Sequence, residues 1–288
     1  MRYILITSLL FCVSLLSTEI DSFTLRDPNM RDSLQELNQI VQGYFTEALQ
    51  EANQAQSCDP EIFETAFQNV MPGILWSRIE NDIENSETMD HRVIGRKNSI
   101  YQDVNLFEGI ALHMARLGFL MKTGDFYVGS DKLGHFFDTG HTYYQKSSFK
   151  EALDYGEMTE RTYYGLQMTA VYSYADLAAN LDGYTFWNRL AKGKNAYVTC
   201  SNNTWRQQYN FNWGDYINAA WDEGINCNRY RNDHVTRSVH NRIAALGMSC
   251  PVNTGYCSDM ISRYGSLAQR IVAKECFEEK ALFTDTGL

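Results

Sequence analysis

Apolar residues recur every three to four positions through much of the chain, which predicts a mainly α-helical protein. The clearest example is residues 31–56, where one face carries Leu34, Leu37, Ile40, Val41, Tyr44 and Leu49. The same spacing predicts helices over 60–82 (interrupted at Pro72-Gly73), 104–122, 131–146, 148–162, 174–190, 213–223, 233–246 and 258–278. Residues 83–100 and 193–212 are expected to be loops, and 163–174 either a short hairpin or a continued helix. We therefore expect a mainly α fold with a short β-hairpin at most.

The first seventeen residues have the pattern of a secretory signal peptide. Arg2 precedes an apolar stretch of roughly a dozen residues that ends in small residues at Ser17, and polar residues follow. That stretch is shorter than the roughly twenty apolar residues that a membrane-spanning helix needs. We therefore predict cleavage, no stable membrane insertion afterwards, a single domain over 18–288, and a secreted or periplasmic location.

The cysteine count agrees with export. Cys12 lies in the predicted leader, and six remain: Cys58, Cys200, Cys227, Cys250, Cys257 and Cys276. An even number in an exported chain predicts disulfides, and the pairing stays open among fifteen possibilities. A local closure between Cys250 and Cys257 is one candidate. Because five of the six lie in the last ninety residues, we expect bridges mainly in the C-terminal third.

The formal net charge of −10 disfavours nucleic acid as a partner, because an acidic surface repels phosphates. Phosphate-binding glycine loops, dinucleotide fingerprints and Gly-x-Ser-x-Gly are absent from the sequence. We therefore expect no cofactor.

Ionisable residues concentrate between Asp131 and His141. In a helix, Asp131, His135 and Asp138 share one face. Such a group can ligate a metal, but His-Glu-x-x-His is absent, and a buried salt-bridge network is the favoured interpretation. A metal-dependent hydrolase using His135, Asp138 and His141 remains an alternative, although we predict no metal site.

Two further segments offer carboxylates beside aromatic residues. Glu160 is expected near the end of a helix, next to Tyr163 and Tyr164, where partial desolvation would raise its pKa and suit a general acid. Ser173 is expected to cap the next helix, with Asp176 as its capping-box partner. Asn180 and Gly183 continue a face of small residues in that helix.

Aromatic residues are abundant in this region, and the chain contains eighteen tyrosines. Rings beside short polar side chains are typical of sugar-binding grooves, and equally of a core with polar edges. The candidate groove residues are Tyr164, Tyr174, Tyr184 and Trp187.

Two resemblances follow from these motifs. Asp131-Lys132-Leu133-Gly134-His135, then Glu160, then the segment from Ser173 to Gly183 resemble small bacterial envelope proteins of unknown activity. Glu160 followed by Gly165-Leu166-Gln167-Met168 is similar to goose-type lysozymes and lytic transglycosylases, and loosely to a lysozyme of predatory bacteria that acts on deacetylated peptidoglycan. The order Leu-Gln-Met and the short gap after Glu160 depart from that pattern.

The second resemblance implies a lysozyme-like catalytic domain that cleaves peptidoglycan or a related glycan, and its looser part implies N-deacetylated glycan as the substrate. Glu160 would protonate the glycosidic oxygen, and Asp138 or Asp176 would stabilise the developing charge. The competing hypothesis is a non-enzymatic envelope protein that binds glycan or protein, with Asp131, His135 and Asn180 forming a structural network.

Overall fold

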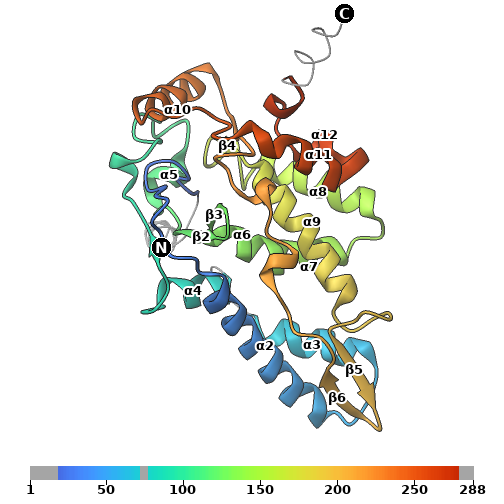
Figure 1. Ribbon diagram of the computed structural model, residues 1–288. Helices are drawn as coiled ribbons and strands as arrows, with labels where there is room; N and C mark the ends of the chain where they lie inside the picture. Colours follow the sequence, from blue (N-terminus) through green and yellow to red (C-terminus); the bar gives the residue numbers. More distant parts are fainter. Residues whose placement is uncertain (1–18, 72–76, 279–288) are drawn as a thin grey trace, which may run out of the picture.

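The computed structural model describes residues 19–71 and 77–278, which form a mainly helical fold with few short strands, as predicted (Figure 1). The predicted signal peptide and the Pro72-Gly73 interruption lie outside the described residues. None of the helices in the described ranges is long and apolar enough to cross a membrane.

Eleven α-helices are present in the described part of the chain. They are α2 (Leu34–Gln54), α3 (Pro60–Val70), α4 (Arg78–Glu84), α5 (Ile110–Met114), α6 (Ser130–Gly134), α7 (Gly140–Tyr144), α8 (Phe149–Arg161), α9 (Tyr174–Arg189), α10 (Asp233–Ala245), α11 (Cys257–Tyr264) and α12 (Ala268–Ile271). A π turn over His135–Thr139 joins α6 to α7.

The strands form three small antiparallel sheets. They are β1 (His91–Arg92), β2 (Leu120–Thr123), β3 (Phe126–Gly129), β4 (Val171–Tyr172), β5 (Val198–Ser201), β6 (Thr204–Gln207) and β7 (Arg229–Tyr230). The sheet orders are β1-β2-β3, β4-β7 and β5-β6, with Met121 opposite Val128 in the β2–β3 hairpin. The β5–β6 hairpin lies beside α2 and α3, far from α10 (Figure 1).

Polar caps begin several of the predicted helices. Asp59 accepts a hydrogen bond from the Glu61 amide at the start of α3, and Pro60 occupies the first turn. Ser148 caps α8 and Asn232 caps α10 in the same way. The boundaries of α2, α8, α9 and α10 accordingly fall close to the predicted ones.

The helix predicted over 104–122 is wrong. Only Ile110–Met114 is helical there, and Leu120–Thr123 pairs with Phe126–Gly129 as a strand. Gly124 lies in the turn of this hairpin at φ +59°, a conformation that glycine adopts readily. The apolar residues of this segment become buried through strand pairing and separate loop contacts. They therefore do not form one face of a helix, despite their helical spacing.

Other segments also differ from prediction. The helix predicted over 258–278 is divided into α11 and α12 by the 3₁₀ turn Gly265–Leu267. Residues 213–223 form two 3₁₀ turns, Trp213–Asp215 and Ala219–Trp221, in place of a helix. The loop expected over 193–212 contains the β5–β6 hairpin. Residues 162–170 form turns that lead into β4, so the hairpin considered for 163–174 is absent there and two hairpins occur elsewhere.

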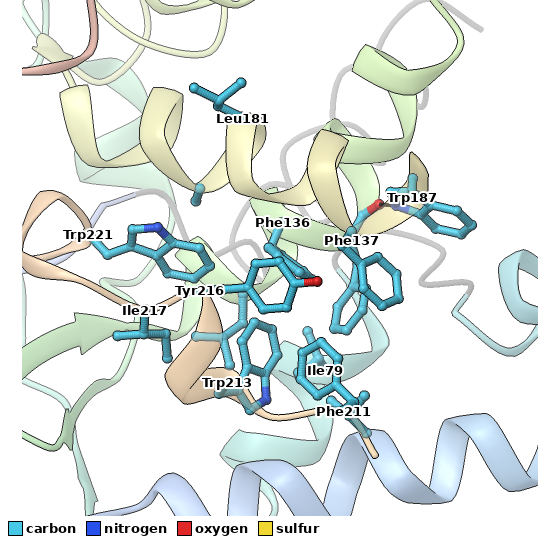
Figure 2. Packing of buried hydrophobic residues seen from close by; sticks show 14 of the residues in the cluster. Ile79, Phe136, Phe137, Leu181, Trp187, Phe211, Trp213, Tyr216, Ile217 and Trp221 are labelled. Atoms are coloured by element: carbon cyan, nitrogen blue, oxygen red, sulfur yellow. Dashed lines mark hydrogen bonds between the residues drawn. The ribbon is translucent and has the colours of Figure 1, made fainter. Parts of the chain in front are cut away.

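Aromatic side chains fill the centre of the molecule around Phe136, which lies 4.9 Å from both Trp213 and Tyr216 between ring centroids (Figure 2). Helices α7 and α9 approach closely beside this cluster because Gly140 faces Gly183. A Cβ added at Gly183 would lie 2.0 Å from the Phe136 carbonyl oxygen. Glycine is therefore required at this crossing, as the small-residue face of α9 predicted.

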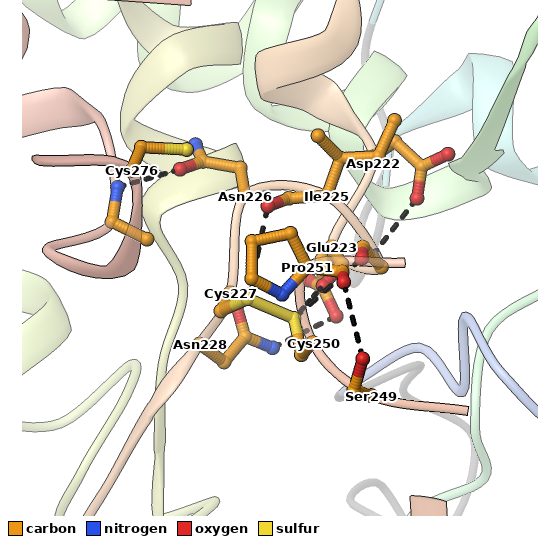
Figure 3. Close-up of a disulfide and its surroundings, with 12 residues drawn as sticks. Asp222, Glu223, Ile225, Asn226, Cys227, Asn228, Ser249, Cys250, Pro251 and Cys276 are labelled. Atoms are coloured by element: carbon orange, nitrogen blue, oxygen red, sulfur yellow. Dashed lines mark hydrogen bonds between the residues drawn. A yellow bond between two sulfur atoms is a disulfide. The ribbon is translucent and has the colours of Figure 1, made fainter. Parts of the chain in front are cut away.

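All six predicted disulfide cysteines are paired. The bridges are Cys58–Cys200, Cys227–Cys250 and Cys257–Cys276. The suggested closure between Cys250 and Cys257 is wrong, since Cys250 is bonded to Cys227 (Figure 3) and Cys257 to Cys276. Two bridges lie in the C-terminal third as expected, and the other joins residues that are 142 positions apart.

The chain enters the core directly at its first described residues. Ile20 is fully buried, and its carbonyl accepts a hydrogen bond from the Tyr101 hydroxyl. Asp21 accepts from the Ile100 amide, and Arg26 forms an ion pair with the buried Asp222. Residues 19–26 are thus an integral part of the fold.

Candidate functional site

The most unusual feature of the interior is a lysine surrounded by carboxylates. Lys132 is 0% exposed, and its ammonium lies 2.7 Å from Asp131 Oδ2 and 2.5 Å from both Asp176 Oδ1 and Glu223 Oε1. The Ser173 hydroxyl lies 2.9 Å from Asp176 Oδ1 and 3.1 Å from Glu223 Oε1. We call Lys132, Asp131, Asp176, Glu223 and Ser173 the lysine cluster.

Local structure brings these side chains together from separate elements. Asp131 and Lys132 lie in α6, which follows directly from β3. Asp176 lies in the first turn of α9, and Glu223 comes from the irregular segment after the 3₁₀ turn Ala219–Trp221. The side-chain amide of Asn228 donates to Glu223 Oε2 at 2.9 Å, beside the Cys227–Cys250 disulfide (Figure 3).

The carboxylates keep the buried lysine charged. Burial alone would lower the pKa of Lys132, but Asp131, Asp176 and Glu223 together hold it well above its ordinary value. Burial also raises the pKa of Asp176, but His135 and Lys132 outweigh it and lower this pKa below the ordinary value. Burial raises the pKa of Glu223 to about 6. Lys132 and Asp176 therefore each favour the charged form of the other inside the protein.

His135 joins the lysine cluster to a second polar layer. Its Nε2 lies 3.2 Å from Asp176 Oδ2, and its Nδ1 lies 3.0 Å from Asn180 Oδ1. Asn180 in turn lies 3.5 Å from the Tyr143 hydroxyl. Of the predicted network, His135 and Asn180 are thus in direct contact, whereas Asp131 connects to them only through Lys132 and Asp176. Both nitrogens of His135 face oxygen atoms within the protein.

Glu160, the predicted general acid, is inside the molecule. It is 3% exposed, and its Oε2 accepts a hydrogen bond of 3.0 Å from the Ser173 amide. Burial raises its pKa well above the ordinary value, repulsion from Asp176 adds to the effect, and the Ser173 amide opposes it. The surroundings of Glu160 therefore favour its protonated form.

The contact with Glu160 changes the expected capping box. Ser173 caps α9 by accepting from the Asp176 amide at 3.1 Å, as predicted. In a capping box the side chain of Asp176 would accept from the Ser173 amide. Instead, the Ser173 amide donates its hydrogen bond to Glu160, and the Asp176 carboxylate accepts from the Ser173 hydroxyl. The cap thereby links the end of α8 to the start of α9.

Asp138 does not join this site, although it was expected on the same helix face as Asp131 and His135. The π turn over His135–Thr139 widens the helix at this point and shifts the register of the following residues. The Asp138 residue is exposed. His141 is half-buried, with its ring 4.4 Å from that of Trp187.

The acidic residues that converge in the structure are not the set that the metal-dependent alternative named. In the described part of the chain, the carboxylates that converge closely enough to share a cation are Asp131, Asp176 and Glu223. The Lys132 ammonium lies between these carboxylates and supplies the positive charge there. This donor set therefore does not call for a metal ion.

The predicted groove aromatics are distributed between core and surface. Trp187 is 1% exposed and donates from Nε1 to the Phe137 carbonyl, so it packs the core. Tyr174 is buried, and Tyr184 is half-buried against Phe149. Tyr164 is 58% exposed and packs edge-on against Tyr163.

Sequence reasoning missed two acids that belong with this site. Glu223 bonds Lys132 directly, and Glu19 is buried with its pKa raised by burial and by repulsion from Glu223 and Asp176. The signal for Glu223 is an acidic pair, Asp222-Glu223, set between Trp221 and Ile225. Glu19 comes directly after the predicted leader, and no pattern in the sequence there predicts that it is buried.

Comparison with protein-family models, with curated proteins and with solved structures finds no match. The fold and the site define the protein as a mainly helical, disulfide-bonded chain with a buried lysine–carboxylate cluster.

Proposed function

We propose that this protein is a non-catalytic binding protein of the cell envelope or the extracellular space, with glycan as its ligand. In this proposal the lysine cluster stabilises the fold. The observation that carries it is the burial of Glu160 and Asp176, whose carboxylates are both engaged by groups of the protein itself.

The geometric demand of glycoside cleavage supports this choice. A general acid must come within about 3 Å of the oxygen that it protonates. The Glu160 side chain is 3% exposed and bonded to the Ser173 amide, and Asp176 is paired with Lys132 and His135. A sugar ring could reach neither carboxylate without displacing these contacts.

Export is part of the same proposal. Three disulfides persist best in an oxidising compartment, and the predicted signal peptide would deliver the chain there. A net charge of −10 keeps such a protein away from anionic lipid headgroups and favours neutral or cationic ligands. Wall glycans are a polymer of that kind, particularly when N-deacetylated.

A second candidate is the lysozyme-like glycosidase with Glu160 as its acid. The specific observation in its favour is the raised pKa of Glu160, which is the direction of shift that suits a general acid. Catalysis by this residue would require its buried carboxylate to become accessible and to leave the Ser173 amide.

Co-sedimentation with purified sacculi, native and chemically N-deacetylated, tests the binding proposal. We expect the protein to pellet with at least one of these preparations and to remain soluble without them. Absence from both pellets would contradict glycan binding. Release of soluble sugar products would favour the second candidate.

A further inference from the structure

A surface groove whose lining includes no member of the lysine cluster is lined mainly by carboxamide residues. It has a volume of about 650 Å³ and lies between the first half of α2 and residues 210–212. Six of its nine lining residues are amides, namely Gln35, Asn38, Gln39, Gln42, Asn210 and Asn212. Asp32 is the one charged residue of the lining.

Part of this amide set fixes the shape of the groove. Asn38 accepts from the Trp213 amide at 2.8 Å and donates to Asn212 Oδ1 at 3.1 Å, which ties α2 to the opposite wall. Gln42 and Gln207 exchange two reciprocal amide hydrogen bonds of 2.6 and 3.1 Å. Because these bonds already hold the walls, a ligand would not have to order them.

The remaining amides face outward with their hydrogen-bonding groups available. Gln35, Gln39 and Asn210 are exposed, and their side chains make no hydrogen bond within residues 19–71 and 77–278. Tyr209, the chain neighbour of Asn210, is 43% exposed. The groove thus offers free donor–acceptor pairs with an exposed ring close by in the chain.

The chemistry of this lining selects the ligand class. Each carboxamide presents a donor and an acceptor together, which matches a sugar acetamido group or a pair of neighbouring hydroxyls. A lining without any cation does not suit phosphate or carboxylate ligands, and uncharged amides suit a neutral one. Exposed tyrosine rings combine an apolar face with a polar tip, as binding of pyranose rings requires.

We propose that this groove is the glycan-binding site and that it recognises neutral oligosaccharides of N-acetylhexosamine. Gln35, Gln39 and Asn210 would contact the sugar, while Asn38 and Gln42 would hold the groove open. The assignment rests on the proposed glycan-binding function and adds to it the place and the chemistry of recognition.

Calorimetric titration of the full chain with chitotetraose tests the site. The variants are Asn210→Ala and the double variant Gln35→Ala/Gln39→Ala, and Gln50→Ala is the matched control because Gln50 is exposed on the same helix but does not line the groove. We expect the double variant to bind about tenfold or more weakly, since two hydrogen bonds are lost. Gln50→Ala should bind as the wild type does.

Equal affinity in the wild type and the groove variants, or absence of binding by the wild type at millimolar sugar, would overturn the assignment. Co-sedimentation with sacculi separates this failure from that of the proposed function. If the groove variants still pellet with sacculi as the wild type does, the site is wrong and glycan binding stands. If the wild type does not pellet at all, the function fails with it.

Discussion

Lys132 holds together carboxylates that would otherwise repel one another in a region without solvent. Removing one partner of a buried ion pair leaves an uncompensated charge, which typically lowers stability by about 3–5 kcal/mol. The ammonium is within ion-pair distance of three carboxylates, so its loss exposes all of them to mutual repulsion.

Lys132→Met is therefore expected to lower the free energy of unfolding at pH 7 by about 3–5 kcal/mol in urea denaturation. The loss should be smaller at pH 5, where Glu223, with its pKa raised to about 6, is largely protonated. Lys150→Met is the control, because the Lys150 side chain is 81% exposed and pairs with Asp154 at the surface. Equal stability of the two variants would show that the lysine cluster is not a structural element.

Glu160 and Asp176 contribute to stability over different pH ranges, because the pKa of Glu160 is raised and that of Asp176 is lowered. The raised pKa means that folded Glu160 keeps its proton after the unfolded chain has lost its own. Its contribution to stability is complete below the ordinary pKa of 4.5 and is lost as pH rises towards the folded value. Asp176, with a lowered pKa, contributes stability above its ordinary pKa and loses it in acid.

Glu160→Gln should consequently fold and should flatten the decline in unfolding free energy above about pH 4.5, since glutamine imitates the protonated acid. Its side-chain oxygen can still accept from the Ser173 amide. Denaturation curves of both proteins between pH 4 and 8 measure the effect. A variant that loses stability equally at every pH would refute a neutral, buried Glu160.

At the scale of elements, the sequence predicted helices well where an apolar stripe coincides with a cap, as in α8 and α10. It failed over 104–122, because Leu120 and Met121 bury through strand pairing, which depends on Phe126–Gly129. Asp131, His135 and Asn180 could be predicted from helical spacing. Glu19 and Glu223 could not, since only tertiary packing brings these irregular segments to Lys132.

The crossing of α7 and α9 allows a sharp test of packing. Gly183→Ala places a methyl group against the Phe136 carbonyl and is expected to lower stability by about 1–3 kcal/mol. Gly43→Ala, at an open position of α2, should instead stabilise by up to about 1 kcal/mol through helix propensity. Chemical denaturation compares the two. A harmless Gly183→Ala would contradict the close approach.

At the scale of the whole molecule, the Cys58–Cys200 disulfide joins the ends of a long loop, whereas Cys257–Cys276 closes a short one. In the chain-entropy model, loops of 142 and 19 residues correspond to about 5 and about 3 kcal/mol respectively. Replacing both cysteines of the long bridge by serine should therefore destabilise more than the same change in the short bridge. Thermal unfolding of the two double variants checks the order, and the reverse order would contradict it.

Under the proposed function, this chain binds glycan without cleaving it. Mass analysis of the soluble fraction after the wild type and Glu160→Gln are incubated with native and deacetylated sacculi tests this most directly. We expect both proteins to pellet with the wall and neither to release sugar products above the buffer control. Reducing-end or anhydro-sugar products that the wild type releases and Glu160→Gln does not would contradict this expectation and identify Glu160 as a catalytic acid.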